Sequence, residues 1–225
     1  MAKELSLHLT NTEREMERMI LWMLASRLGQ SIQGVTVAGM RALKPLIKNA
    51  ILRCPEMAEL QGGKLAGELG LWPSLQTLAP EMIAEAVAET VFLKPVKVVV
   101  VGSQLKGGML LQIQPSDFGN VLGLDVASYK YFRRTKRRSE KIPWLRWLLT
   151  AGSSPVLLRY HLEAGQVSRS GKGVIMKRPG TWSVPSDSAG TIEDNFITRA
   201  LDDAEMRNNI LSILNRLWVR QLSAI

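Results

Sequence analysis

The sequence predicts an α+β fold, with helices at both ends of the chain and a mostly antiparallel β-sheet with hairpins between them. Residues 1–92 carry apolar side chains at helical spacing, residues 96–185 contain short β-branched runs, and residues 206–222 return to a helical period. We expect a mainly helical region over residues 1–92 and an α+β core region over residues 93–225, joined as one continuous structural unit. At 225 residues, 46% of them hydrophobic, the chain can bury a sizeable core.

A capping box predicts the start of the first helix. Glu15 follows Thr12 by three residues, so that their side chains can satisfy free amides at a helix start, and an apolar stripe then continues to about residue 29. Methionine suits either a core or a subunit-facing surface, and we expect this stripe to face the core. The stripe consists of Met16, Met19, Ile20, Met23, Leu24 and Leu28.

Glycine and proline predict the limits of the next helices. Gly29 and Gly34 are expected to break the helical pattern, Pro45 to begin a second helix, and Pro55 to end or kink it. Further helices are expected over residues 55–60, over residues 64–71, and from Pro80 to about residue 91.

β-Branched residues predict strands in the second part of the chain. Residues 96–101 and 109–114 lie between Pro95 and Pro115, and the sequence Lys106-Gly107-Gly108 indicates the turn of a hairpin between them. Further strands are expected over residues 156–162, 174–176 and 182–184, followed by a helix to Leu201 capped by Thr191 and Asp194, and by an amphipathic helix over residues 206–222.

Positive charge is concentrated in one short segment. The net charge is +9, and residues 130–146 hold eight basic residues against the single acid Glu140, so that the segment carries 8 − 1 = +7. Such a concentration indicates contact with a polyanion, which needs no reading of base sequence; the alternative is a solvated loop that aids solubility. The candidate DNA-facing or partner-facing residues are Lys130, Arg133, Arg134, Lys136, Arg137, Arg138 and Lys141.

The sequence contains no complete motif for catalysis or for binding a cofactor. The tract at residues 170–173 resembles a phosphate loop but lacks its first glycine and its Ser or Thr after lysine. With two histidines and Cys54 as the single cysteine, we expect no zinc site, no disulfide and a buried, inert thiol. We therefore expect no enzymatic activity, no cofactor and no metal. The longest apolar stretch is far below the ~20 residues that cross a bilayer, so that no membrane contact is expected.

Four motifs in the second half of the chain carry a family resemblance. They are IPWLRWLLT at residues 142–150, SRSGKGVIM at 168–176, TWSVP at 181–185 and AGTIEDNFITRAL at 189–201. Together they resemble a family of virion proteins of tailed bacteriophages that sit in the neck, where the head joins the tail. Residues 53–71 resemble the same family more loosely.

The resemblance implies a structural virion protein that forms a ring. It implies a homo-oligomer, a hexamer or a dodecamer, in contact with neighbouring head-tail connector and tail proteins, with DNA passing through its channel. A tail terminator or tail completion type is favoured over a portal adaptor, because adaptors are expected to be nearly all helical. The implied location is the virion, after assembly in the host cytoplasm. The candidate subunit-interface or core residues are Trp144, Trp147, Arg169, Trp182, Asn195, Phe196 and Arg199.

The basic segment departs from this family, in which fewer consecutive arginines and lysines are expected. We expect it to face the DNA channel or a neighbouring subunit. The alternative function is that of a cytoplasmic nucleic-acid-binding protein, which binds without base specificity through residues 129–146 and has no role in a virion.

Overall fold

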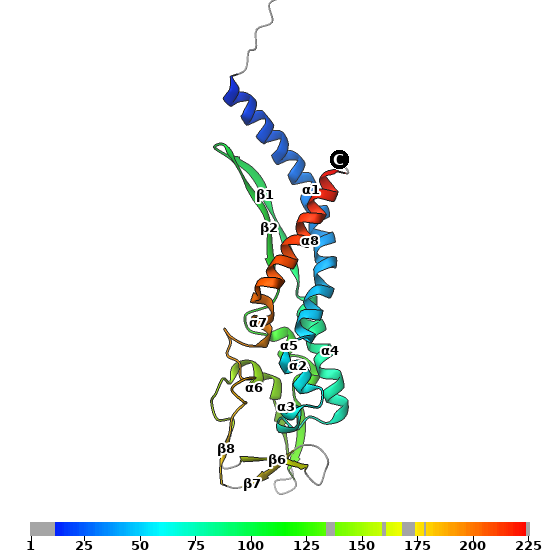
Figure 1. Cartoon of the computed structure of the whole chain (residues 1–225), viewed down its shortest axis with the longest axis vertical. Coiled ribbons are helices and arrows are strands. Elements are labelled where there is room, and N and C mark those ends of the chain that lie inside the picture. The colour runs from blue at the N-terminus through cyan, green and yellow to red at the C-terminus, as the bar shows by residue number, and fades with distance from the viewer. Residues whose placement is uncertain (1–11, 134–137, 159–160, 168–173, 178, 224–225) are drawn as a thin grey trace, which may run out of the picture. The chain divides into compact units, whose positions relative to one another are not determined.

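The computed structural model describes residues 12–133, 138–158, 161–167, 174–177 and 179–223 (Figure 1). The predicted α+β class is confirmed, with helices at both ends and antiparallel strand pairs between them. The chain divides into two compact units, which are described separately below. Unit 1 comprises Met1–Arg41, Phe92–Gln112 and Ser212–Ile225, and unit 2 comprises Ala42–Val91 and Ile113–Leu211.

The first helix, α1 (Glu13–Leu52), begins where the capping box predicts. The backbone N–H of Thr12 donates to Glu15 Oε2 at 2.8 Å, which is the half of the box in which the glutamate satisfies an amide at the helix start.

The predicted breaks in this helix are wrong, because α1 continues through Gly29, Gly34 and Pro45. A glycine inside a helix costs only about 1 kcal/mol, which packing against other elements can outweigh. Pro45 removes one helical hydrogen bond, the one to the carbonyl of Arg41. The division between the two units falls directly after Arg41.

Unit 1 is built from a helix, a β-hairpin and the end of a second helix (Figure 1). At Gly39 of α1, side chains of two other elements come very close to the backbone of the helix. A Cβ at this position would lie 2.7 Å from Leu93 Cδ1 and 3.1 Å from Leu214 Cδ2. The missing side chain therefore lets the strand and the second helix both pack against α1. These elements are β1 (Phe92–Val101), β2 (Gln104–Gln112) and α8 (Ala204–Ser223).

The hairpin of unit 1 contains a β-bulge. The register between β1 and β2 shifts so that residues 97–98 of β1 lie opposite Gly107 alone. Gly107 has φ +138°, and a Cβ there would lie 2.5 Å from the carbonyl oxygen of Lys97. The prediction of a turn at residues 106–108 is therefore wrong, because these glycines lie inside β2 and the chain reverses at Gly102.

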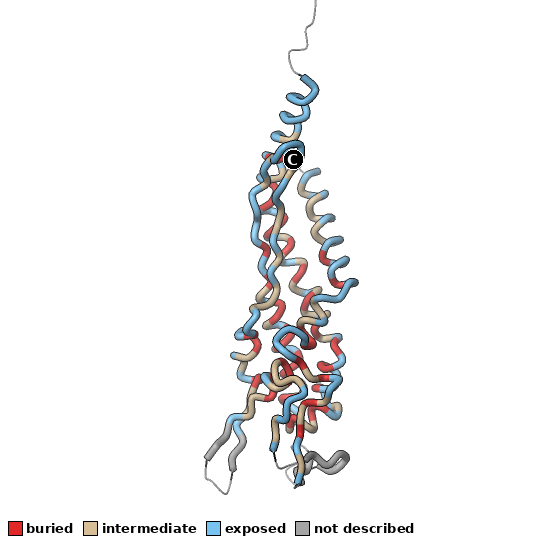
Figure 2. Tube along the Cα trace, turned by 90° about the vertical axis from the view of Figure 1, so that its left-hand side faces the viewer, coloured by how far each residue is buried: buried red, intermediate tan, exposed pale blue. Residues whose placement is uncertain are grey.

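Unit 2 contains the 17-residue helix α4 and several short helices around a buried core. Figure 2 shows the buried residues gathered among these helices. The predicted start of a helix at Pro80 is wrong, because Pro73 takes the first position and Pro80 lies inside the same helix. The helices are α2 (Pro55–Leu60), α3 (Lys64–Glu68), α4 (Pro73–Glu89), α5 (Gly119–Leu122), the 3₁₀ helix η1 (Asp125–Ala127), α6 (Trp144–Thr150) and α7 (Phe196–Asp202).

The strands of unit 2 form separate antiparallel pairs within the described residues. The expected central sheet is thus divided into two-stranded pairs, each of which needs packing from the rest of the unit to be stable. β3 (Tyr129–Arg133) pairs with β4 (Arg138–Ile142), β5 (Leu157–Leu158) with β8 (Thr181–Trp182), and β6 (His161–Val167) with β7 (Val174–Lys177).

The core of unit 2 brings together residues from both parts of its sequence. Ile47 of α1, Ile83 of α4, Leu145 of α6 and Phe196 of α7 are all fully buried. At the edge of this core, Lys48 bridges Glu81 and Glu85 of α4 at 3.1 and 2.7 Å. Apolar burial therefore joins the helices, and an ion-pair row reinforces the contact between α1 and α4.

Two glycine-to-alanine changes should have opposite effects on stability. Gly190 lies where a Cβ would be 2.6 Å from Asn195 Cβ and 2.7 Å from the Leu148 carbonyl oxygen, so we expect Gly190→Ala to cost about 1–3 kcal/mol of unfolding free energy. Gly29 has no atom within 4 Å of the corresponding position, and Gly29→Ala should add about 0.5–1 kcal/mol. Urea unfolding measures both, and a stable Gly190→Ala variant would contradict this packing.

Candidate nucleic-acid interface

The basic segment predicted from the sequence forms an antiparallel hairpin of β3 and β4. Its register places Lys130 opposite Lys141 and Arg133 opposite Arg138. Like charges directly opposite each other destabilise an antiparallel pair. A bound anion would relieve the repulsion between Lys130 and Lys141. The other predicted basic residues, Arg134, Lys136 and Arg137, lie outside the described residues.

The first strand of the hairpin is anchored to unit 2 through its first residue. The hydroxyl of Tyr129 donates to the carbonyl oxygen of Leu69 at 2.8 Å. The ring of Tyr129 also meets Trp72 edge-on, with 5.3 Å between ring centroids. The start of β3 is therefore tied to the segment between α3 and α4.

The second strand is anchored through the helix that follows it. Trp144, the first residue of α6, is fully buried and donates its indole N–H to the carbonyl oxygen of Val126 at 2.7 Å. Trp147 of the same helix meets Trp182 edge-on, with 6.4 Å between ring centroids. Both strands are thus fixed at the base of the hairpin by aromatic side chains.

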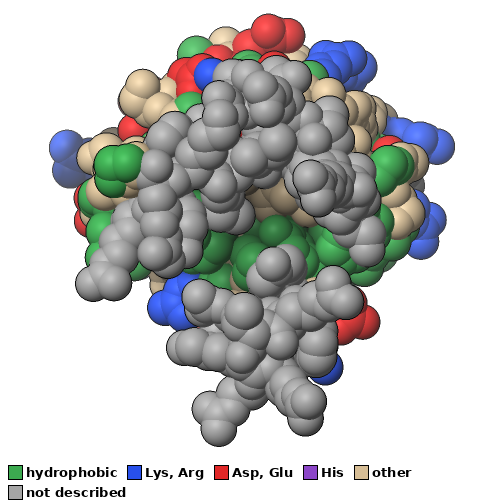
Figure 3. All heavy atoms as spheres, turned by 90° about the horizontal axis from the view of Figure 1, so that it is seen from below, with side chains coloured by type: hydrophobic (Ala, Val, Ile, Leu, Met, Phe, Trp, Pro, Cys, Tyr) green, Lys and Arg blue, Asp and Glu red, His purple; other side chains and the backbone are tan. Residues whose placement is uncertain are grey.

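A shallow hollow of about 200 Å³ lies at the base of the hairpin. Lys130 and Lys141, both exposed, line it from the two strands, and the carboxylate-bearing Asp125 of η1 lines it as well. Viewed from below, the molecule shows hydrophobic side chains near the centre, with both basic (Lys, Arg) and acidic (Asp, Glu) side chains around the rim (Figure 3). Two lysine ammonium groups beside a hollow of this size suit a phosphate group.

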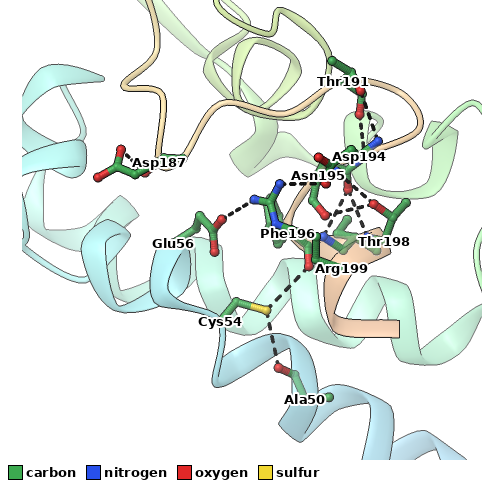
Figure 4. Close-up of polar contacts among 12 residues, drawn as sticks. Ala50, Cys54, Glu56, Asp187, Thr191, Asp194, Asn195, Phe196, Thr198 and Arg199 are labelled. Atoms are coloured by element: carbon green, nitrogen blue, oxygen red, sulfur yellow. Dashed lines mark hydrogen bonds and ion pairs between the residues drawn. The ribbon is translucent and has the colours of Figure 1, made fainter. Parts of the chain in front are cut away.

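A second polar cluster lies around the start of α7 (Figure 4). Arg199 Nη2 donates to Glu56 Oε1 at 2.6 Å, and Nη1 donates to Asp194 Oδ1 at 3.0 Å. Glu56 is only 5% exposed, so that Arg199 supplies the cationic partner of a buried carboxylate. Burial acts to lower the pKa of Arg199, but the hydrogen bonds to Glu56 and Asp194 outweigh it and raise that pKa above its ordinary value.

Asn195 caps α7 in this cluster. Its Oδ1 accepts from the backbone N–H of Ile197 and of Thr198, and Thr198 Oγ1 accepts from the Asn195 N–H at 2.8 Å. The prediction that Thr191 and Asp194 cap this helix is wrong. The hydroxyl of Thr191 instead accepts from the Asp194 N–H at 3.1 Å, in the turn before the helix.

The predicted interface or core residues fall mostly in the core of unit 2. Trp144, Trp182, Asn195 and Phe196 are buried, and Trp147 is half-buried. Arg199 is committed to Glu56 and Asp194 within its own chain, and Arg169 lies outside the described residues.

Sequence reasoning missed Glu56, which lies 143 positions before Arg199. An acid inside an otherwise apolar helical pattern, directly after Pro55, is the available signal, because a buried carboxylate requires a partner.

Cys54 is the single cysteine and is buried, as expected. Its thiol faces the backbone carbonyl oxygens of Ala50 and Phe196 at 3.5 and 3.7 Å (Figure 4). Burial, with a smaller contribution from the charge of Glu56, raises the pKa of the thiol to about 11. Among the described residues, no group of three or more His, Cys, Asp or Glu side chains is placed to hold a metal ion.

No protein-family model matches the chain, and searches among curated proteins and solved structures give no match either. Across the described ranges, every helix is too short or too polar to span a lipid bilayer.

Removing Arg199 should destabilise the protein more than removing an exposed arginine. Arg199→Met leaves Glu56 buried without its cation, and we expect it to cost about 1–3 kcal/mol of unfolding free energy. The matched control is Arg207→Met, since Arg207 pairs with Asp202 at 2.8 Å on the surface and should contribute about 0–1 kcal/mol. If urea unfolding gave equal losses of unfolding free energy for the two variants, the contact with the buried Glu56 would contribute no more to stability than a surface ion pair.

The thiol of Cys54 should be unreactive in the folded protein. With its pKa raised to about 11, it stays protonated and buried at pH 8, so that iodoacetamide should modify it only after unfolding in urea. Because the unfolded thiol ionises near its ordinary value of 9.0, the contribution of this group to stability is present below that pH and falls as pH rises toward 11. Mass spectrometry checks the labelling, and rapid modification in buffer would contradict the burial.

Proposed function

We propose that this protein is a structural subunit of the neck of a tailed bacteriophage, of the tail terminator or tail completion type. In this proposal, copies of the chain form a ring that joins the head side to the tail, and DNA passes through the channel of the ring. The observation that carries the proposal is the β3–β4 hairpin, in which Lys130 and Lys141 stand opposite each other on a firmly anchored base. The family resemblance of residues 142–201 supports the location in the virion neck.

The chemistry of the hairpin suits DNA that moves. Lysine and arginine attract phosphates through charge and counterion release, without hydrogen bonds to particular bases. A contact of this kind holds every sequence equally and lets the duplex slide. In a ring, each copy would present its own hairpin, and the attraction would act around the whole duplex.

The same hairpin also supports a second candidate, a cytoplasmic nucleic-acid-binding protein without a role in a virion. The two candidates differ in assembly. A neck protein should form rings of fixed stoichiometry, visible by electron microscopy and native mass spectrometry, and should be present in mature phage particles. The second candidate should remain a monomer or dimer with strongly salt-dependent DNA affinity. A solitary chain at high concentration that is absent from particles would overturn the neck proposal.

The two lysines at the base of the hairpin should contribute directly to DNA affinity. We expect Lys130→Gln/Lys141→Gln to weaken binding to duplexes of any sequence and to lower the slope of log affinity against log salt by about 2, as two phosphate contacts are lost. The matched control is Arg216→Gln/Arg220→Gln, which removes the same charge from exposed positions of α8.

Fluorescence anisotropy at several salt concentrations measures both variants. If the two double variants change the slope equally, net charge alone explains the binding and the hairpin has no particular role.

A further inference from the structure

The start of α1 carries apolar residues on two opposite sides. One side turns toward the rest of unit 1 and includes Ala25 and Ile32, which are buried. The other side is the stripe of Met16, Met19, Ile20, Met23 and Leu24, whose exposed fractions range from 40% to 66%. The expectation that this stripe faces the core is therefore wrong. Figure 2 shows the start of α1 as almost entirely exposed.

The exposed stripe is large for a surface without a partner. It comprises five long side chains that are each about half exposed. At about 200 Å² for a fully exposed side chain of this size, they leave roughly 500 Å² of apolar surface per copy. A standard protein interface buries about 800 Å² per partner. The stripe alone therefore supplies most of one side of a stable contact.

A second exposed apolar surface lies on the outer face of the β1–β2 hairpin. Val96, Val99 and Leu110 are 39% to 58% exposed. They belong to one row of register pairs, Lys94 with Leu110, Val96 with Gly108 and Val99 with Lys106, so that they share a face. The opposite face includes Leu93, which is buried against α1.

The charges beside the first turns of the stripe are complementary to those of the hairpin, and the exposed Arg27 follows on the same side of α1 one turn beyond Met23. Glu13 and Glu17 are one helical turn apart and lie on the side of the stripe formed by Ile20 and Leu24, at 100° per residue. On the hairpin, Lys94 and Lys106 are both exposed and belong to the same outer row as the valines. The stripe is thus an apolar surface with glutamates at its edge, and the hairpin face is an apolar surface with lysines, so that the two can attract each other.

We propose that the α1 stripe of one copy of this chain docks on the outer face of the β1–β2 hairpin of the next copy. Apolar burial would stabilise the contact, and the glutamates beside the stripe would pair with Lys94 and Lys106 to fix its direction. Docking of α1 on α1 of a second copy would instead place Glu13 and Glu17 against an identical acidic edge or require an antiparallel arrangement.

This contact is heterologous, because it joins two different surfaces. Each copy therefore keeps one free stripe and one free hairpin face until the series closes; such contacts generate rings where the rotation between copies closes and open filaments where it does not. The inference rests on the proposed function, since it names the surfaces through which the neck ring would assemble.

Two variants that each disable one surface test the inference. Met19→Lys/Met23→Lys disables the stripe, and Val96→Lys/Leu110→Lys disables the hairpin face. All four side chains are exposed, so that both variants should fold, which circular dichroism checks. The matched control is Leu158→Lys/Ile192→Lys, which places the same charges on exposed apolar positions of unit 2.

The variants are compared by native mass spectrometry and electron microscopy, alone and mixed. We expect wild type and the control to form rings, and each surface variant alone to remain monomeric. An equimolar mixture of the two surface variants should give a one-to-one heterodimer and no ring, because one intact stripe meets one intact hairpin face and the two lysine-bearing surfaces repel.

The failures of the inference and of the proposed function are distinguishable. Rings that persist in both surface variants would overturn this interface and leave the ring proposal intact. Loss of assembly in the stripe variant alone, with no heterodimer in the mixture, would overturn the heterologous contact in favour of stripe-to-stripe docking. A wild-type chain that is monomeric at high concentration would overturn both.

Discussion

The buried indole N–H of Trp144 donates to the carbonyl of Val126 at 2.7 Å, and this hydrogen bond holds the end of the β3–β4 hairpin against the core. On the other strand, at the same base of the hairpin, the hydroxyl of Tyr129 donates to the carbonyl oxygen of Leu69. Two strands with lysine opposite lysine would separate if nothing else held them, because a two-stranded pair is marginal in water and like charges weaken it further. The apolar core therefore keeps cations close together in a way that the hairpin could not achieve alone.

The two units carry different kinds of surface. Unit 2 combines a closed core with a concentration of positive charge at its hairpin, which suits a polyanion. Unit 1 leaves apolar side chains uncovered on α1 and on β1–β2, which suits protein contacts. A subunit that assembles with its own kind around DNA needs both properties. The neck proposal rests on this combination together with the resemblance of the later motifs, and the charged hairpin alone would equally suit a simple DNA-binding protein.

Local patterns predicted the elements whose limits depend on local chemistry. The start of α1 at the Thr12 and Glu15 pair and the bounds of α2 at Pro55 and Leu60 are examples.

Patterns failed where distant residues decide. Helix α1 passes through its glycines and Pro45 because other elements pack against it, and Leu93 and Leu214 at Gly39 could not be foreseen from sequence. The basic residues were visible in the sequence, but their pairing across β3 and β4 was not, because a run of charges has no alternation of apolar and polar residues that would predict strands. The partnership of Arg199 with Glu56 was likewise hidden by sequence distance.

The bulge opposite Gly107 restricts how the β1–β2 hairpin can vary in length. Val96 and Val99 are three positions apart, and in a regular strand they would point to opposite sides; the extra residue between them restores them to one side. Inserting or deleting a single residue in β1 beyond this point would exchange the inward and outward rows up to the tip. Descendants of this gene should therefore lengthen or shorten the tip in steps of two residues per strand, and should retain a glycine wherever the extra residue remains.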